Sequence, residues 1–369
     1  MKIKADKKSL LTAIAPALLA VSSSAPIPVL EYIKLSAKDS TLSVTGYDLG
    51  KGVKTETSVF VEEEGTILLN PQKINSIIRS MPDDMIDIST GEKGIVTVSC
   101  KKIKFEILGL APEGYPNLPE LSGDKSFDIE KGVLKRICQQ VLFSVALDDK
   151  KPVLSGVLFE LDRTKMTVVS CDAFRLSICR ENVKSDEMLR FIVPGKTLTE
   201  LIKLLDDSEE KITVELTAKH LIVHFGDIYF FSRLIEGEYI DYMRSIPQNS
   251  PIEVRVRLDE FISSCERASL IIDERAKSPI KLNIVPFGVL ISCTTANGRI
   301  DDEVQAKTSG GEVEIGFNNR YLLDALKGAL AAGDEEVVLR LSTSLVGMSI
   351  QPATHDGYFY LVLPVRLNG

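Results

Sequence analysis

A short apolar pattern occurs three times in this chain of 369 residues, each time 124 positions after the previous copy. Each copy has apolar residues at i, i+3 and i+4, which lie on one face of an α-helix, and a basic residue follows directly. The three copies are Ile74-x-x-Ile77-Ile78-Arg79, Leu198-x-x-Leu201-Ile202-Lys203 and Leu322-x-x-Ala325-Leu326-Lys327. A constant period of this length means that the chain folds as three similar units.

A second helical pattern recurs earlier in each unit. Its copies are Leu11-x-x-Ile14, Leu134-x-x-Ile137 and Ile262-x-x-Cys265. Runs of alternating apolar and polar residues surround both patterns and predict strands that are half exposed. One such strand is expected over Val153–Leu161, and the first helix over Ser9–Val21. The predicted fold class is therefore α+β, with two helices packed on antiparallel sheets in each unit.

Proline-rich segments mark the boundaries between the units. Proline favours extended backbone and stops a helix, so residues 112–119 and 247–251 are interpreted as linkers. The predicted domains are residues 1–122, 123–248 and 249–369. Linkers stiffened by proline hold neighbouring domains at a set angle, and such an arc can close into a ring when two chains join.

The N-terminal stretch has some features of a secretory signal, with basic residues ahead of an apolar run. Asp6 interrupts the basic part, and the Leu11-x-x-Ile14 pattern recurs in the other two units. We therefore interpret this stretch as the first helix of unit one. No other apolar run approaches the roughly 20 residues that a membrane-spanning helix needs.

Composition and motifs argue against catalysis. The six cysteines form no CxxC pair, and they are expected to be buried free thiols in a reducing cytoplasm. His220 and His224 would share one face of a strand about 13 Å apart, too far for one metal ion. Phosphate-loop, dinucleotide-binding and serine-nucleophile motifs are absent from the sequence. We predict a non-catalytic protein that needs no cofactor or metal.

Basic residues recur at two positions of the second helix in the units. The chain carries a net charge of −8, which disfavours nonspecific adhesion to nucleic acid, but a local basic face remains compatible with it. Each residue alone fits a solvated helix face, whereas the repetition favours a surface that follows a phosphate backbone. The predicted DNA-facing residues are Arg79, Lys196, Lys203, Arg320 and Lys327. The first helices add Lys7, Lys8, Lys131, Lys135, Arg136 and Arg267, and the loop 148–151 adds two further lysines.

A second set of residues is apolar and includes the end of the chain. Leu154, Leu176 and Ile240 belong to it, together with the run 361–365, and Arg175 and Arg366 stand beside them. Chain ends usually fray unless they are tied down. An apolar ending therefore needs a surface to cover it, either in its own domain or on a peptide ligand.

Five segments, in this order, carry a family resemblance. They are Leu154-Ser155-Gly156-Val157-Leu158-Phe159, Asp172 with Arg175-Leu176, Gly237-Glu238-Tyr239-Ile240-Asp241-Tyr242, Glu314-Ile315-Gly316-Phe317-Asn318 with Tyr321-Leu322-Leu323-Asp324-Ala325-Leu326, and Leu363-Pro364-Val365-Arg366-Leu367. Through them the chain resembles the bacterial DNA polymerase III beta subunits, the beta sliding clamps, over essentially its whole length. The resemblance implies a processivity factor in which two head-to-tail chains form a closed ring around duplex DNA and tether polymerase through a peptide-binding groove.

The resemblance also implies partners and sites. The partners would be duplex DNA held without reading its sequence, a second copy of the chain, the DNA polymerase III alpha subunit, the clamp loader and other clamp-motif proteins, with no membrane partner. The implied groove consists of Leu154, Cys171, Ala173, Phe174, Arg175, Leu176, Ile240, Leu361, Leu363, Pro364, Val365 and Arg366. The implied dimer contact pairs Phe105 and Ile107 of the first domain with Leu270 and Ile271 of the third.

The chain departs from the family pattern at several of these positions. Cys171, Ala173 and Phe174 stand where the family usually has Thr, Gly and His or Tyr, and Ile240 stands where it usually has Pro. Ser24 replaces a residue that is basic in some members, and Asn368-Gly369 extends the usual ending. These departures motivate an alternative, a divergent clamp paralogue with a specialised set of partners.

Overall fold

The computed structural model describes residues 1–22, 25–119, 121–147, 151–272 and 278–367. The chain forms two compact units. Unit 1 contains Met1–Ile129 and Lys211–Leu234, and unit 2 contains Glu130–Glu210 and Ile235–Gly369. The strands at 211–234, which belong to the second sequence repeat, thus fold with the first repeat.

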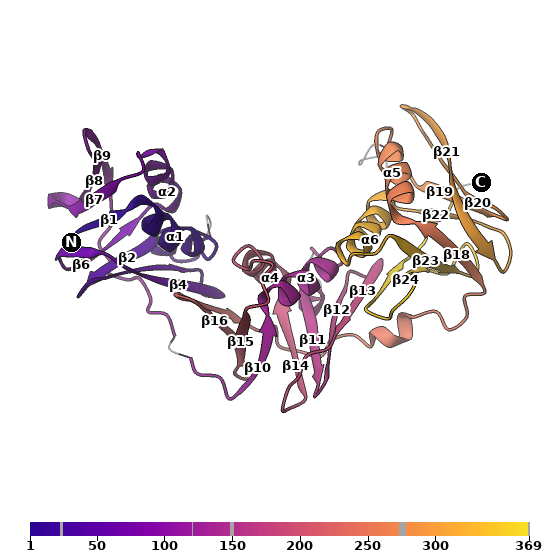
Figure 1. Ribbon diagram of the computed structural model, residues 1–369, viewed down its shortest axis with the longest axis horizontal. Helices are drawn as coiled ribbons and strands as arrows, with labels where there is room; N and C mark the ends of the chain where they lie inside the picture. Colours follow the sequence, from indigo (N-terminus) through magenta and orange to yellow (C-terminus); the bar gives the residue numbers. More distant parts are fainter. Residues whose placement is uncertain (23–24, 120, 148–150, 273–277, 368–369) are drawn as a thin grey trace. The chain divides into compact units, whose positions relative to one another are not determined.

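Unit 1 holds two sheets (Figure 1). The five-stranded sheet has the order β5-β1-β7-β8-β9 and comprises β1 (Lys2–Asp6), β5 (Phe60–Glu63), β7 (Met85–Thr90), β8 (Ile95–Cys100) and β9 (Ile103–Leu108). The eight-stranded sheet has the order β10-β15-β16-β17-β4-β3-β2-β6 and comprises β2 (Ile33–Lys38), β3 (Thr41–Tyr47), β4 (Lys51–Ser58), β6 (Gly65–Leu69), β10 (Lys125–Glu130), β15 (Lys211–Leu216), β16 (His220–Phe225) and β17 (Ile228–Arg233).

Unit 2 is built on one sheet of twelve strands, in the order β14-β11-β12-β13-β25-β24-β23-β18-β21-β20-β19-β22. Its strands are β11 (Gly156–Asp162), β12 (Lys165–Cys171), β13 (Arg175–Glu181), β14 (Leu189–Pro194), β18 (Ile252–Arg257), β19 (Ile280–Val285), β20 (Gly288–Thr295), β21 (Gly298–Ser309), β22 (Val313–Phe317), β23 (Glu336–Leu341), β24 (Met348–Pro352) and β25 (Tyr358–Val362). Strand pairing joins the repeats in both units, β17 with β4 and β13 with β25, and each pair is antiparallel.

The described residues form six α-helices, two for each sequence repeat. They are α1 (Lys7–Leu18), α2 (Pro71–Ser80), α3 (Lys131–Leu142), α4 (Gly195–Leu201), α5 (Leu258–Ser269) and α6 (Asn319–Ala331). In unit 1, α1 packs against α2 and against β3 and β4. A side chain at Gly46 would clash with the carbonyl oxygen of Ala17, so this glycine allows α1 to lie directly on β3. In unit 2, α6 packs against both α5 and α3.

Capping residues explain where the helices begin. Asn70 accepts a hydrogen bond from the Lys73 amide (3.0 Å) ahead of α2, and Asn318 accepts from the Arg320 amide (3.0 Å) ahead of α6. Helix α4 follows Pro194, which provides no side-chain cap, and it is shorter than its two counterparts. The first helix begins at Lys7, earlier than predicted, because Asp6 caps it through the Ser9 amide (2.9 Å).

The prediction of a strand over Val153–Leu161 was wrong in its first part. Residues Pro152–Ser155 form a 3₁₀ turn, and strand β11 starts only at Gly156. Proline at the first position of the turn has the backbone angle that such a turn requires, and the Ser155 hydroxyl donates to the Pro152 carbonyl (2.7 Å). Three further 3₁₀ turns span Pro28–Glu31, Glu92–Gly94 and Tyr242–Ser245.

A backbone bridge recurs at the end of each repeat. In every case, a residue that follows the last strand of the repeat donates its amide to the strand that precedes the second helix, with N···O distances of 2.8–2.9 Å. The three bridges join Leu110 to Leu68, Ile235 to Ile192 and Val365 to Gly316. The acceptors are 124 positions apart, so the sequence period is also a structural one.

Candidate functional site

Asp172 organises the turn between β12 and β13 through its side chain and its amide. Its Oδ1 accepts hydrogen bonds from the amides of Phe174 and Arg175, both at 3.0 Å, and the Asp172 amide donates to the Arg175 carbonyl (3.2 Å). Aspartate favours turns because its carboxylate reaches amides two and three residues ahead. Ala173 takes a left-handed conformation (φ 72°), which costs a residue with a Cβ about 1 kcal/mol. The turn leaves the Phe174 ring exposed.

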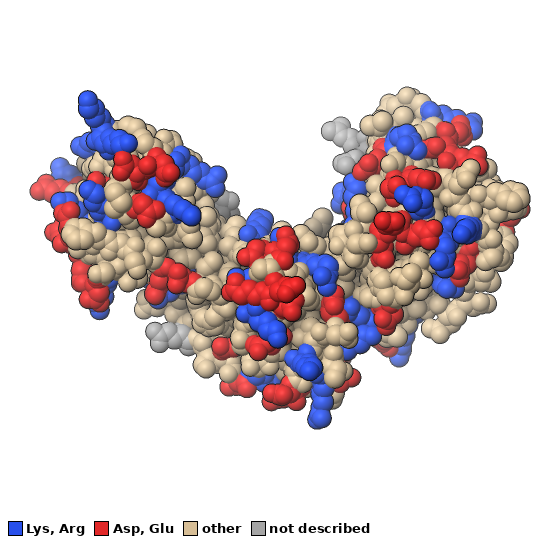
Figure 2. All heavy atoms as spheres, viewed as in Figure 1, with Lys and Arg blue, Asp and Glu red and all other residues tan. Residues whose placement is uncertain are grey.

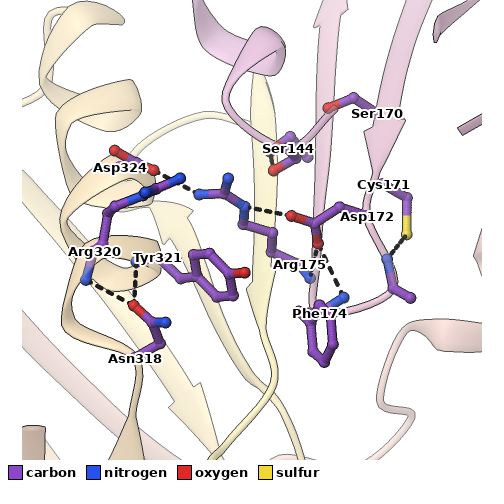
Figure 3. Close-up of polar contacts among 12 residues, drawn as sticks. Ser144, Ser170, Cys171, Asp172, Phe174, Arg175, Asn318, Arg320, Tyr321 and Asp324 are labelled. Carbon is purple, nitrogen blue, oxygen red and sulfur yellow. Dashed lines mark hydrogen bonds and ion pairs between the residues drawn. The ribbon is translucent and has the colours of Figure 1, made fainter. Parts of the chain in front are cut away.

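Arg175 is held between two carboxylates (Figure 3). Its Nε lies 2.9 Å from Asp172 Oδ2, and its Nη1 lies 2.6 Å from Asp324 Oδ2 on α6. The guanidinium carbon also lies 4.3 Å from the ring centroid of Tyr321 and 5.6 Å from that of Phe143. Only 7% of the Arg175 side chain is exposed. The structure therefore gives this predicted groove residue partners within the protein.

The end of the chain is tied down beside this turn. The Leu363 amide donates to the Phe174 carbonyl (2.8 Å), and the Val365 amide donates to the Gly316 carbonyl (2.8 Å). The side chains of Leu363 and Val365 remain 39% and 38% exposed, and that of Phe174 is 58% exposed. We call these three side chains the apolar patch. Backbone pairing within unit 2 thus holds this segment in place, while the side chains of Leu363 and Val365 stay partly exposed.

The twelve predicted groove residues divide by burial. Leu154, Cys171, Leu176 and Leu361 belong to one buried cluster with Tyr239, and Ile240 packs against that cluster. Arg175 is buried in its ion pairs, and Pro364 is half-buried. The exposed members are Ala173, Phe174, Leu363, Val365 and Arg366. Their role in binding a peptide stays a prediction.

Three residues next to the patch belong to the quoted motifs but were not predicted as site residues. Tyr321 stacks on Arg175, and its ring centroid lies 6.2 Å from that of Phe174, whereas Asp324 completes the second ion pair. A signal for both was present, because residues three apart on a helix lie on the same face. Gly316 is a third, since a side chain there would overlap the Leu367 side chain.

The five predicted DNA-facing residues are all exposed, namely Arg79, Lys196, Lys203, Arg320 and Lys327. Lys203 pairs with Glu200 (2.7 Å) and Lys327 with Glu266 (2.8 Å), and both are solvated ion pairs. On the face shown in Figure 2, basic and acidic side chains are interspersed over each unit. Their role towards DNA stays a prediction.

Most cations of the first helices are engaged locally. Acidic partners hold four of them, Lys131 with Glu210, Lys135 with Asp207, Arg136 with Glu181 and Arg267 with Asp302. Lys7 donates to the carbonyls of Arg79 (2.9 Å) and Met81 (2.6 Å), which closes the C-terminal end of α2. Lys8 is exposed.

The residues predicted to form the dimer contact lie at accessible positions. Phe105 is 38% exposed and Ile107 is half-buried, and both belong to β9, the edge strand of the five-stranded sheet. Leu270 at the end of α5 is 85% exposed, and Ile271 is half-buried. Ser24, residues 148–150 and Asn368-Gly369 lie outside the described residues.

The described residues hold no cluster of histidine, cysteine and acidic side chains that could bind a metal ion. The rings of His220 and His224 pack on Phe231 and Tyr229 respectively. All six cysteines are buried and free, and burial raises the pKa of the Cys179 and Cys265 thiols to about 12. Among the helices that the structure describes, none combines the length and apolar character needed to cross a membrane.

Three α+β repeats, joined to one another by shared sheets, define a clamp-type protein. Comparison with known families makes this specific. The N-terminal, central and C-terminal domains of the DNA polymerase III beta subunit match residues 1–119, 128–241 and 243–366. The chain belongs to this family, the beta sliding clamps, which are the non-catalytic processivity factors of DNA polymerase III.

Individual relatives agree with this assignment. The chain is 31% identical over 360 residues to the beta sliding clamp of Staphylococcus epidermidis, and the aligned residues make up 95% of each chain. It is 30% identical to that of Staphylococcus aureus, with 99% of each covered. A crystal structure of the DNA polymerase sliding clamp of Bacillus subtilis superposes over the full length of both chains with a TM-score of 0.93 at 28% identity. The predicted family, fold class and function in DNA replication are confirmed.

Proposed function

We propose that two copies of this chain join head to tail into a ring around duplex DNA. In this ring, short peptides of the DNA polymerase III alpha subunit, the clamp loader and other clamp-motif proteins dock on the apolar patch. Family membership supports the ring. The observation that carries the docking proposal is the patch itself, in which three exposed apolar side chains, Phe174, Leu363 and Val365, lie on adjoining backbone segments held together by hydrogen bonds.

Three exposed apolar residues suit a short linear ligand that binds through a few apolar anchors. Each leucine or phenylalanine of a ligand that becomes fully buried contributes about 1.5–3 kcal/mol. A few anchors of this kind give modest affinity, which allows one partner to replace another. Leu176 and Leu361 of the buried cluster stand two positions from Phe174 and Leu363 in the chain, so the cluster would anchor the segments that carry the patch.

For the DNA side of the proposal, the exposed residues Arg79, Lys196, Lys203, Arg320 and Lys327 would face the duplex. Lysine and arginine contacts to phosphates carry no sequence information, so binding would be independent of sequence. A closed ring retains DNA by topology and needs only weak contacts, which leaves sliding easy. The cytoplasmic location that this role requires is likewise part of the proposal.

The docking proposal is tested by fluorescence anisotropy with a labelled clamp-motif peptide that contains adjacent leucine and phenylalanine. Deleting Leu363–Gly369 should abolish binding and leave the dimer mass unchanged in light scattering. Phe287→Ala is a matched control, because Phe287 is 84% exposed and lies outside the patch. Unchanged peptide affinity after the deletion would refute the docking assignment.

The ring is tested on DNA and by its subunit contact. The loaded protein should stay on nicked circular DNA and leave once the circle is cut. Leu270→Lys or Ile271→Lys should yield monomers, since each places a charge at the proposed apolar contact. A wild-type chain that is monomeric at micromolar concentration would count against the ring.

The second candidate is a divergent clamp with a specialised set of partners. Ala173 and Phe174 favour it, because both are exposed and stand where the family usually has Gly and His or Tyr. A panel of polymerase, clamp-loader and repair peptides separates the two candidates. A replicative clamp should bind the polymerase and loader peptides, and a specialised one should prefer others.

A further inference from the structure

Arg175 connects two sequence repeats at the apolar patch. It begins β13 in the second repeat, and its guanidinium reaches Asp324 on α6 in the third. The side chain is nearly fully buried and lies against the Tyr321 ring, as Figure 3 shows. Two of its nitrogens are already paired with carboxylates and little of the side chain is exposed, so the guanidinium offers a ligand little accessible surface.

Phe174 directly precedes Arg175 in the turn and is also a member of the apolar patch. Its amide donates to Asp172, its carbonyl accepts from the Leu363 amide (2.8 Å), and its ring lies beside Tyr321. Phe174, a residue of the turn, therefore contacts both helix α6 and the last residues that the structure describes. In Figure 3 the Phe174 ring points away from the guanidinium of Arg175, so the ion pairs fix the backbone of the turn and leave the ring accessible.

From this geometry we infer that Arg175 and Asp324 are positioning residues for the peptide-docking surface. The inference rests on the proposed function of the apolar patch and deepens it. The ion pair between them connects the Asp172 turn to α6. This connection keeps Phe174 and Leu363 in the arrangement that a peptide binds. Peptide recognition thus depends on Asp324, which acts through Arg175.

Binding kinetics separate positioning from direct contact. If the ion pair keeps the surface in the arrangement that binds peptide, Asp324→Asn lowers the fraction of molecules in that arrangement. The association rate then falls in proportion, by about tenfold when about one tenth of the molecules can bind. The dissociation rate should then stay within about twofold, whereas loss of a direct contact acts mainly on dissociation. Stopped-flow measurements with the labelled peptide give both rates.

A matched control breaks another ion pair that involves α6. Glu266→Gln removes the solvated partner of Lys327, and it should leave both rates unchanged. Melting temperature and dimer mass are recorded for every variant. Asp324→Ala serves as a second variant, and it should slow association at least as much as Asp324→Asn does. Unchanged association in both Asp324 variants, or a change confined to dissociation, would overturn the inference.

A reporter that needs no peptide completes the test. The chain contains no tryptophan, so Phe174→Trp introduces a single fluorophore at the turn. Adding Asp324→Asn should lower the fluorescence anisotropy of this tryptophan and shift its emission to the red. If the reporter does not respond, the positioning role is wrong even where peptide binds. If wild-type protein binds no peptide, the proposed docking function fails, and the reporter alone decides the role of Arg175 and Asp324.

Discussion

Two turns at equivalent positions of the first and second repeats, Asp48–Lys51 and Asp172–Arg175, share the aspartate and its hydrogen-bond pattern and differ at the three residues that follow it. Asp48 accepts from the amides of Gly50 (2.9 Å) and Lys51 (2.8 Å), as Asp172 does from the amides two and three residues ahead of it. The residue after each aspartate is left-handed, with φ 72° in both turns. A basic residue three positions on then pairs with the second carboxylate oxygen, at 3.2 Å for Lys51.

The turns differ in how many carboxylates their basic residue contacts. The Lys51 ammonium pairs with Asp48 inside its own turn. Arginine presents several donors in a planar fork, so Arg175 pairs with Asp172 and extends to Asp324 as well. The basic residue of the first turn pairs with the aspartate of that turn, whereas Arg175 also links the second turn to α6. Turns with the same hydrogen-bond pattern thus differ in their connections, because the longer-reaching arginine meets a carboxylate on α6.

The largest expected contrast comes from removing each aspartate. Asp172→Ala should lower the free energy of unfolding by about 3 kcal/mol, because it leaves a buried guanidinium with one carboxylate fewer. Asp48→Ala should cost less, about 1–2 kcal/mol, because it removes two turn hydrogen bonds and the ion pair with Lys51 but leaves no buried guanidinium. Urea unfolding followed by circular dichroism measures both. Equal losses would mean that the two turns are energetically alike.

Exchanging the basic residues should give a smaller contrast. Arg175→Lys removes the fork, so only one carboxylate can be satisfied, and stability should fall by about 1–2 kcal/mol. Lys51→Arg should change stability by less than about 0.5 kcal/mol, as for most substitutions away from buried networks. Thermal unfolding of the two variants, measured side by side, tests this. A neutral Arg175→Lys would show that the contact with Asp324 adds nothing to stability.

The smallest effects are expected at the left-handed residues. Ala173→Gly relieves strain but increases the freedom of the unfolded chain, so the net gain should stay below about 1 kcal/mol. Leu49→Gly should instead destabilise, because Leu49 packs against the buried cluster of Leu30, Leu68 and Tyr115. Opposite signs in differential scanning calorimetry are the predicted result. Stabilisation by both substitutions would contradict the packing role of Leu49.

Local signals in the sequence predicted the helices well and the sheets less completely. The repeated pattern at Ile74, Leu198 and Leu322 placed the second helices. The pairing of β17 with β4 was not predictable, because periodicity identifies a strand but not its neighbour. The 3₁₀ turn at Pro152 was missed because its apolar residues continue the pattern of the strand that follows.

The candidate site was predictable in composition but not in the division of roles among its residues. The quoted motifs contained Arg175, Tyr321 and Asp324, yet only the folded chain shows that they contact one another. Burial also separated supporting residues such as Leu176 from exposed ones such as Phe174. A contact between side chains about 150 positions apart depends on the packing of α6 against the second repeat, which local patterns do not encode.

The pairing of β17 with β4 has a practical consequence for dissecting the protein. A fragment cut at the repeat boundary, residues 1–122, would lose the neighbour of β4 along Lys51–Thr55 and expose unpaired amides and carbonyls there to solvent. Such a fragment should self-associate during expression. A piece that also retains Lys211–Leu234, connected through a short designed loop, would keep that edge covered.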